Sequence, residues 1–292
     1  MQQNQLVHPI DSKSILYAVI GDPIVHSKSP IMMNRAFLET GINGVYVAFH
    51  IKDHALPDFV AGIRAMNIRG VNVTIPHKQA IMPLLDAIDP AAQAIGAVNT
   101  IVNDNGKLTG YNTDGIGYVR SLKQEAMPQL QGKKIVILGA GGAARGIVYA
   151  LLQEQPEQIM LINRTVSKAE ELGSSLQAYC MEGSVLQACS PEQTERIIAQ
   201  ADLVINTTST GMFPNVEETP LDTSLLSEHT VVSDLIYNPL TTKFLLTAAD
   251  RGMKTHGGLG MFIYQGAYAF EYWTGVDAPV SAMRDVVLAS LS

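Results

Sequence analysis

Three glycines near the middle of the chain stand where a phosphate could be bound. Residues 133–138 have the composition of a buried β-strand and run directly into Gly139, Gly141 and Gly142, after which residues 145–153 show a helical pattern. Between a strand and a helix, such glycines let the backbone approach a pyrophosphate, and the unpaired amides at the start of the helix point at its negative charge. The pattern therefore predicts a dinucleotide site, although an ordinary tight turn could have the same glycines.

The residues after the next predicted strand indicate which dinucleotide is bound. That strand, residues 158–163, ends at Asn163 and is followed by Arg164 and Thr165. At this point an NAD site needs a carboxylate for the ribose hydroxyls. A guanidinium at this point fits a 2′-phosphate through paired charge-assisted hydrogen bonds, and Thr165 and Lys168 can add a donor and a charge. NADP is therefore preferred over NAD. Arg164 could alternatively be a solvated residue that starts the next helix.

The elements that must position these residues alternate between strand and helix. Short apolar runs and helical patterns follow one another along the chain, which is typical of an α/β fold with largely parallel sheets. In the first part we expect strands at residues 16–20, 45–51, 70–75 and 97–103 and helices at residues 30–39 and 53–66. Later strands at 158–163, 203–206 and 230–235 predict a second, doubly wound sheet, and a last helix is expected at 261–273.

The length of 292 residues favours two domains, each large enough to bury its own core. We place the first boundary at residue 114, after the turn cluster of residues 103–106 and the short run that follows it. The prediction is an N-terminal α/β substrate domain of residues 1–114, completed by C-terminal helices in residues 261–292, and a Rossmann-type NADP-binding domain of residues 115–260.

The composition excludes several classes of function. The formal net charge is −7, from 20 basic and 27 acidic side chains, so a nucleic-acid surface is not expected. Cys180 and Cys189 are the only cysteines and do not form a close pair, which predicts neither a disulfide framework nor a metal site. The polar residues 1–14 predict a loose extension without a signal peptide, and no apolar run is long enough to span a membrane. We therefore expect a cytoplasmic protein.

Several short motifs, spread over nearly the whole chain, resemble those of the shikimate dehydrogenase family. Their common order and spacing carry the resemblance, because any one of them alone could arise by chance. Besides the glycine turn, they are Gly21-Asp22-Pro23-Ile24 with His26-Ser27-Lys28-Ser29-Pro30, Asn72-Val73-Thr74-Ile75-Pro76-His77-Lys78, Gly96-Ala97-Val98-Asn99-Thr100, Asn112-Thr113-Asp114-Gly115, Asn163-Arg164-Thr165, Asn206-Thr207-Thr208-Ser209, and Gly258-Leu259-Gly260-Met261 with Gln265.

The resemblance implies an enzyme that interconverts shikimate and its 3-keto form with NADP. Oxidising a secondary alcohol requires hydride transfer to the nicotinamide and removal of the hydroxyl proton by a positioned group. By the resemblance, Lys78 exchanges that proton and Asp114 orients the hydroxyl. From spacing alone, Lys78 could instead be a solvated residue that opens a helix, and Asp114 could be a helix N-cap.

The resemblance also implies which residues bind the two small molecules. Ser27 and Ser29 match the pair that binds the substrate carboxylate, and the ring hydroxyls would contact Asn72, Thr74, Asn99, Gln265 and Tyr237. NADP would be bound by Gly139, Ala140, Gly141, Gly142, Ala143, Asn163, Arg164, Thr165, Lys168, Thr207 and Gly258. Taken singly, loop serines and asparagines are more often turn formers than ligands, and Tyr237 could belong to a plain turn. His26 and His77 are expected behind the contact residues or at the surface.

Two alternatives stay open at this point. Gln79 resembles the quinate/shikimate branch of the family, with broader substrate and cofactor use, whereas the Asn-Arg-Thr segment resembles the NADP-dependent shikimate branch. The other alternative is an NADP-binding regulator without turnover, although such a protein would have no chemical need for both Lys78 and Asp114. We expect small-molecule partners, no nucleic acid and no membrane, and a monomer or a homodimer.

Overall fold

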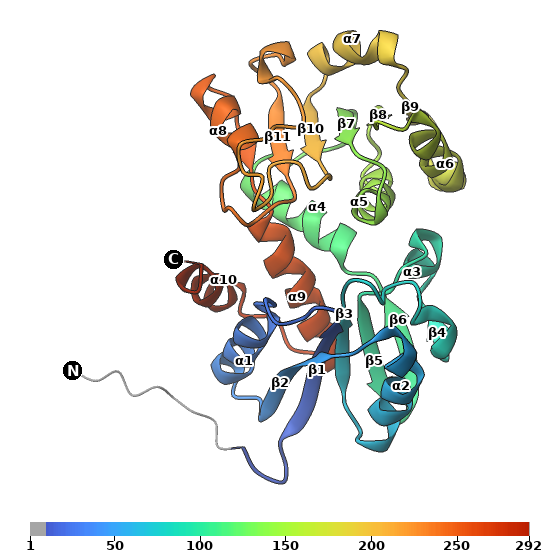
Figure 1. Cartoon of the computed structure of the whole chain (residues 1–292), viewed down its shortest axis with the longest axis vertical. Helices are drawn as coiled ribbons and strands as arrows, with labels where there is room; N and C mark the ends of the chain where they lie inside the picture. The colour runs from blue at the N-terminus through green and yellow to red at the C-terminus, as the bar shows by residue number, and fades with distance from the viewer. Residues whose placement is uncertain (1–9, 292) are drawn as a thin grey trace, which may run out of the picture. The chain divides into compact units, whose positions relative to one another are not determined.

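The computed structural model describes residues 10–291 and forms two compact units (Figure 1). The first consists of Met1–Thr113 together with Gln265–Ser292, and the second of Asp114–Tyr264. The long helix α9 (Leu259–Thr274) contributes its beginning to the second unit and the rest to the first. Most of the predicted N-terminal extension, residues 1–9, lies outside the described residues. The described part of it is not loose, because Ser14 Oγ donates to Asn43 Oδ1 at 2.7 Å.

The first unit is built on a mixed six-stranded sheet in the order β2-β1-β3-β5-β6-β4. The strands are β1 (Ile15–Gly21), β2 (Gly44–His50), β3 (Gly70–Val73), β4 (Ala87–Ile88), β5 (Thr100–Asp104) and β6 (Lys107–Tyr111). The prediction of parallel strands is right for β2, β1 and β3 but wrong for β5, which runs antiparallel to both β3 and β6. A two-residue turn at Asn105 and Gly106 joins β5 to β6, and such turns produce hairpins.

Helices cover both faces of this sheet. Neighbouring residues of a strand point to opposite sides, so each strand contributes side chains to both cores. Ala18 and Ile20 of β1 pack in one core with Val60 and Ile63 of α2 (Leu56–Ala65). On the opposite face Tyr17 stacks on Phe37, and Phe37 contacts Phe270. The remaining helices of the unit are α1 (Ser29–Thr40), α3 (Pro90–Ile95) and α10 (Val280–Ala289), with single 3-10 turns at Asp53–Ala55 and Met82–Leu84.

The second unit contains a six-stranded, fully parallel sheet in the order β12-β11-β10-β7-β8-β9. Its strands are β7 (Lys134–Leu138), β8 (Gln158–Ile162), β9 (Val185–Ala188), β10 (Leu203–Asn206), β11 (Val231–Asp234) and β12 (Thr255–His256). Counted within the unit, this is the order 6-5-4-1-2-3 of a doubly wound dinucleotide-binding fold, with the reversal between β7 and β10. The predicted Rossmann-type sheet is therefore confirmed.

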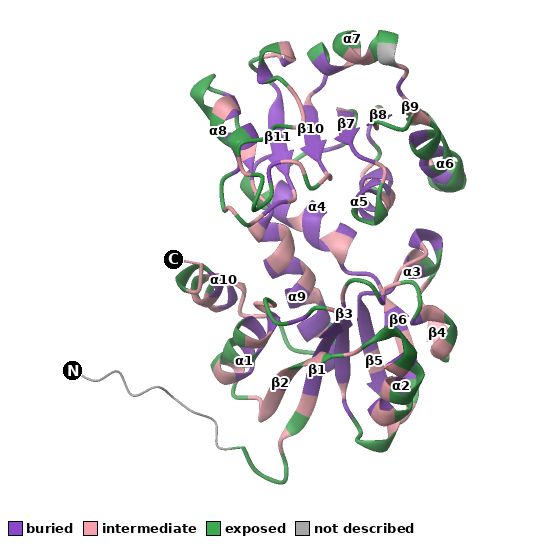
Figure 2. Cartoon of the chain, viewed as in Figure 1, coloured by how far each residue is buried: buried purple, intermediate pink, exposed green. Residues whose placement is uncertain are grey.

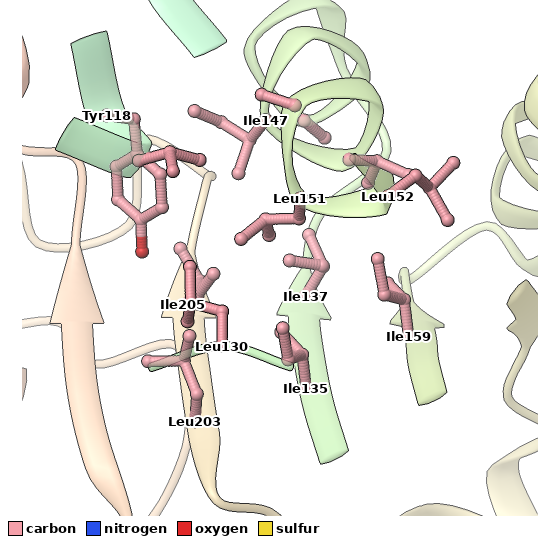
Figure 3. Close-up of a cluster of buried hydrophobic side chains, with 14 of the residues drawn as sticks. Tyr118, Leu130, Ile135, Ile137, Ile147, Leu151, Leu152, Ile159, Leu203 and Ile205 are labelled. Atoms are coloured by element: carbon pink, nitrogen blue, oxygen red, sulfur yellow. The ribbon is translucent and has the colours of Figure 1, made fainter. Parts of the chain in front are cut away.

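Both faces of this second sheet are covered by apolar side chains. Figure 3 shows Ile137 of β7 and Ile205 of β10 in one cluster with Leu151 of α5, and all three are fully buried. Burying such a side chain stabilises the fold by about 1.5–3 kcal/mol. Figure 2 shows β10 and β11 buried along their length, as expected of strands covered on two sides. The helices are α4 (Asp114–Glu125), α5 (Gly142–Leu152), α6 (Val166–Leu176), α7 (Thr194–Ala199) and α8 (Lys243–Asp250), with 3-10 turns at Gln177–Tyr179, Pro191–Gln193 and Thr223–Leu225.

None of the helices in residues 10–291 combines the length and the apolar character needed to cross a membrane.

The indole of Trp273 fixes the end of α9 on the sheet of the first unit. It is 3% exposed, and its Nε1 donates to the carbonyl of Ile101 at 2.9 Å. A Cβ atom at Gly70 of β3 would overlap the indole ring. Glycine is therefore required at position 70 for this packing.

We expect Gly70→Ala to lower the free energy of unfolding by about 1–3 kcal/mol, because the added methyl group forces the indole or the strand to move. Equilibrium denaturation in urea measures the change.

Gly62→Ala is the matched control in the same unit. Its Cβ would come within 3.2 Å only of Cε of Met66, the end of an exposed side chain, and alanine is favoured over glycine in a helix by up to about 1 kcal/mol. Unfolding curves for Gly70→Ala that match the wild type would show that the indole contact is not constraining.

Candidate functional site

The glycine turn lies at the carboxyl end of β7, where the strand order of the second unit reverses. Gly139 has a φ of +112°, and a Cβ atom there would come within 2.6 Å of Thr207 Oγ1. The Thr207 amide and hydroxyl both donate to the carbonyl of Leu138, at 2.9 and 2.8 Å. Only a glycine at position 139 lets the loop after β10 pack this closely on the loop after β7. Thr207 is thereby held beside the glycine turn.

The start of α5 offers unpaired backbone donors in open space. Gly141 is the N-cap residue and supplies no side-chain cap, so the first amides of the helix have no side-chain acceptor. A Cβ atom at Gly141 or Gly142 would meet no atom within 4 Å, and Ala143 is exposed. Amides at a helix N-terminus bind phosphate through hydrogen bonds and the helix dipole. This end of α5 therefore fits the pyrophosphate of a dinucleotide.

Arg145 strengthens this fit and was missed by the sequence analysis. Its Nε is buried and has no hydrogen-bond partner among the described residues. A buried donor without an acceptor is costly, and helical side chains lean toward the N-terminus of their helix, which here is the glycine turn. The only sequence signal was a single cation three residues after Gly142.

The residues after β8 form a corner that carries two cations, Arg164 and, in the first turn of α6, Lys168. Asn163 Nδ2 donates to the carbonyl of Thr165 at 2.8 Å, which closes the turn ahead of α6. Arg164, Thr165 and Lys168 are exposed, and the guanidinium and ammonium groups have no ion pair with other residues in the described range. Arg164 precedes the N-cap Thr165 and is not part of α6. The corner can therefore accept an anion such as a 2′-phosphate.

A buried carboxylate orders the loops that follow β10 and β11. Asp234 accepts hydrogen bonds from Asn206 Nδ2 at 3.1 Å, from the Ile236 amide at 3.0 Å and from Thr242 Oγ1 at 2.8 Å. Its burial raises the pKa of the carboxyl group above the usual value. The loop carrying Thr207 and the loop carrying Tyr237 are thus joined at one point. Sequence patterns gave no indication of this network.

Tyr237 and Gly258 lie next to these loops in the second unit. The ring of Tyr237 stacks on Phe262 of α9, with 5.0 Å between the centroids. The Gly258 amide donates to the carbonyl of Ile236 at 3.2 Å, which holds the turn before α9 against the loop after β11. Tyr237 is therefore packed on α9 within the second unit.

In the first unit, the two predicted carboxylate-binding serines lie at the beginning of α1. The Ser29 amide donates to Ser27 Oγ at 3.3 Å, and Ser29 is the first residue of the helix. Ser29 is buried and Ser27 is half-buried. Two hydroxyl groups at the positive end of a helix dipole are suited to an anionic group. Gln265 lies on α9 beside Gly266, which packs against Met32 one turn into α1.

Three of the five predicted hydroxyl-binding residues, Asn72, Thr74 and Asn99, lie near the end of β3 and just before β5. Asn72 donates through Nδ2 to the carbonyl of Asn99 at 3.2 Å, so the structure brings these two asparagines together. Asn99 Oδ1 in turn accepts from the Thr113 amide at 2.8 Å. Thr74 follows β3, and its amide donates to the carbonyl of Ile20 at 3.0 Å. Three strand ends thus place these polar groups close together.

Lys78 lies in a turn after β3 and does not open an α-helix, so that alternative for it is wrong. It is half-buried, and its carbonyl accepts from the Val98 amide at 2.8 Å, which joins this turn to the segment before Asn99. Asp114 is the first residue of α4, in the second unit, where the helix dipole favours a carboxylate. Lys78 therefore belongs to the first unit and Asp114 to the second.

The two histidines near the motifs differ from each other. His26 is exposed. His77 is fully buried, and its Nε2 lies 2.6 Å from the carbonyl of Ile51. These features indicate a structural role for His77, which precedes Lys78 in the chain. Among the described residues no group of three or more His, Cys, Asp or Glu side chains is arranged to hold a metal ion.

Three family models match successive parts of the chain. The shikimate dehydrogenase substrate-binding domain matches residues 19–101, the shikimate/quinate 5-dehydrogenase model matches residues 121–223, and the C-terminal domain of shikimate 5′-dehydrogenase matches residues 258–288. A curated relative from Geobacillus sp. (strain WCH70), named shikimate dehydrogenase (NADP(+)), is 51% identical over 94% of this chain and 98% of its own length.

Solved structures agree with these matches. Shikimate 5-dehydrogenase from Listeria monocytogenes, in complex with shikimate and NAD, is 39% identical, covers 97% of this chain and 100% of its own, and superposes with a TM-score of 0.90. The enzyme from Thermus thermophilus, in complex with NADP(H) and shikimate, is 36% identical, covers 95% of this chain and 100% of its own, and has a TM-score of 0.85. From its strand order, its glycine turn and these matches, the chain belongs to the shikimate dehydrogenase family.

Proposed function

We propose that this chain is an NADP-dependent oxidoreductase that interconverts shikimate and 3-dehydroshikimate. The observation that carries the proposal is the likeness, along nearly the whole chain, to proteins named as NADP-dependent shikimate dehydrogenases. The open amides of the glycine turn and the cationic corner after β8 support the cofactor. The proposal assigns substrate binding to residues 1–114 and 261–292, and NADP binding to residues 115–260.

NADP would be held by backbone amides of residues 139–143 at its pyrophosphate and by Arg164, Thr165 and Lys168 at its 2′-phosphate. Asn163, Thr207 and Gly258 shape the surrounding loops through the contacts described above. When bound, the reduced cofactor supplies the hydride. The protein residues contribute binding, orientation and proton transfer.

The proton is assigned to Lys78 and the orientation of the reacting hydroxyl to Asp114. In the reducing direction Lys78 donates a proton to the oxygen of the 3-keto group as negative charge develops on it, and in the oxidising direction it takes that proton back. Ser27 and Ser29 would donate to the carboxylate of the substrate, and Asn72, Thr74, Asn99, Gln265 and Tyr237 would contact its hydroxyl groups. The two serine hydroxyl groups are neutral donors, and the positive end of the α1 dipole adds to their attraction for the carboxylate.

The experiment that tests this assignment measures steady-state oxidation of shikimate by NADP with the wild type and with Lys78→Ala. Losing the proton acceptor should lower kcat by at least about 100-fold, with only a small change in KM for shikimate.

The control is Lys107→Ala, which removes an exposed lysine of β6 in the same unit and should retain the wild-type kcat. If Lys78→Ala raises KM and leaves kcat intact, then Lys78 binds the substrate and does not transfer the proton.

Arg164→Ala should weaken NADP binding by about tenfold or more and leave NAD binding nearly unchanged, because only NADP carries the phosphate that the guanidinium pairs with. Fluorescence titration of each dinucleotide measures the two dissociation constants.

Arg196→Ala, an exposed arginine on α7, is the matched control and should change neither constant. Equal weakening of NADP and NAD by Arg164→Ala would reject the contact with the 2′-phosphate.

A further inference from the structure

We propose that Tyr46 is a positioning residue of the substrate site, whose buried hydroxyl group fixes the side chain of Asn72. The sequence motifs do not include this tyrosine. The inference rests on the proposed function, because it assigns Asn72 to a ring hydroxyl of the substrate. Both residues belong to the first unit.

The ring of Tyr46 is held from several sides. Tyr46 lies in β2 and is 2% exposed. The side chain of Asn34, in α1, clamps its backbone: Asn34 Nδ2 donates to the Tyr46 carbonyl at 2.8 Å, and the Tyr46 amide donates to Asn34 Oδ1 at 2.9 Å. The phenol ring contacts the indole of Trp273, with centroids 6.1 Å apart. The hydroxyl group therefore occupies one defined position.

Hydrogen bonding fixes the direction of the bond between Tyr46 and Asn72. The carbonyl of Asn99 can only accept, so Asn72 must turn Nδ2 toward it, and the second proton of Nδ2 goes to Thr100 Oγ1 at 3.1 Å. Asn72 Oδ1 then faces the Tyr46 hydroxyl at 2.7 Å, and the tyrosine is the donor. With both amide protons used, Asn72 can offer a ligand the second lone pair of Oδ1. It is therefore suited to accept a hydrogen bond from a substrate hydroxyl.

Burial keeps the phenol in the form that donates. It raises the pKa of the Tyr46 hydroxyl well above its ordinary value, so the phenol stays protonated and continues to donate to Asn72.

Tyr46 should consequently affect substrate binding and not the chemical step. In the described structure its hydroxyl group donates to Asn72, which we assign to a ring hydroxyl of the substrate other than the reacting one. Losing the phenol hydroxyl leaves Asn72 Oδ1 without its donor, so the amide is held less firmly. This change weakens binding of the ground state and of the transition state alike.

The test is Tyr46→Phe, which removes one oxygen and keeps the ring packing. We expect KM for shikimate to rise about tenfold, with kcat and the NADP dissociation constant within about threefold of the wild type. An unchanged KM, or a fall in kcat at constant KM, would overturn the inference.

The matched control is Tyr118→Phe in the second unit. Tyr118 is fully buried, and its hydroxyl donates to Ser233 Oγ at 2.9 Å, so this variant also loses one buried hydrogen bond. It should lower Tm to a similar extent and leave KM for shikimate unchanged. If both phenylalanine variants raise KM equally, then the effect is one of general stability and Tyr46 has no special place.

A double-mutant cycle shows whether Tyr46 acts through Asn72. Once Asn72 is replaced by alanine, adding Tyr46→Phe should raise KM by much less than tenfold. Fully multiplicative effects of the two substitutions would overturn the inference.

The wild type is assayed first, with shikimate and NADP. An inactive wild type would contradict the proposed function and this inference with it, whereas an active wild type with an unaffected Tyr46→Phe variant would contradict only the inference.

Discussion

The second unit depends on one close approach of two loops at the point where its strand order reverses. Gly139 and Thr207 can pack together only because position 139 has no side chain. The parallel sheet brings the carboxyl ends of β7, β8 and β10 to one edge. The glycine turn, the corner after β8 and Thr207 therefore lie at the same edge of the sheet.

The first unit is proposed to bind a small ligand that carries hydroxyl groups and a carboxylate. Here the polar groups come from strand ends and from the start of α1, and each is held by hydrogen bonds to the backbone or to a neighbouring side chain. Side chains that are already held in place lose less conformational entropy when a ligand binds. The chain of contacts from Asn99 through Asn72 to Tyr46 gives each group a fixed hydrogen-bonding role.

The sequence predicted those features that are local in the chain. The glycine turn, the residues after β8 and the main strands of both sheets each have a signal within a few residues, and the structure has them where expected. The two-residue strands β4 and β12 have no such signal, because so short a segment shows no periodicity. The antiparallel direction of β5 was not predicted, because the pairing direction of a strand is set by tertiary contacts. The hairpin turn between β5 and β6 was nevertheless visible in the sequence.

The supporting residues could not be predicted, because their partners are distant in sequence. Tyr46 and Asn72 are 26 residues apart, and Asp234 joins Asn206, 28 residues away, to Thr242. Arg145 could be noticed only once its Nε was seen to be buried without a partner among the described residues. The motifs themselves indicated the family, but motif residues alone do not show what holds them in place.

The central claim, an NADP-dependent oxidoreductase that acts on shikimate, is tested most directly by steady-state kinetics of the wild type with shikimate or quinate, each combined with NADP or NAD. We expect kcat/KM to be highest for shikimate with NADP, by at least about tenfold over either exchange. A higher value with quinate or with NAD would contradict the assigned substrate or cofactor, and no turnover in any combination would contradict the enzyme.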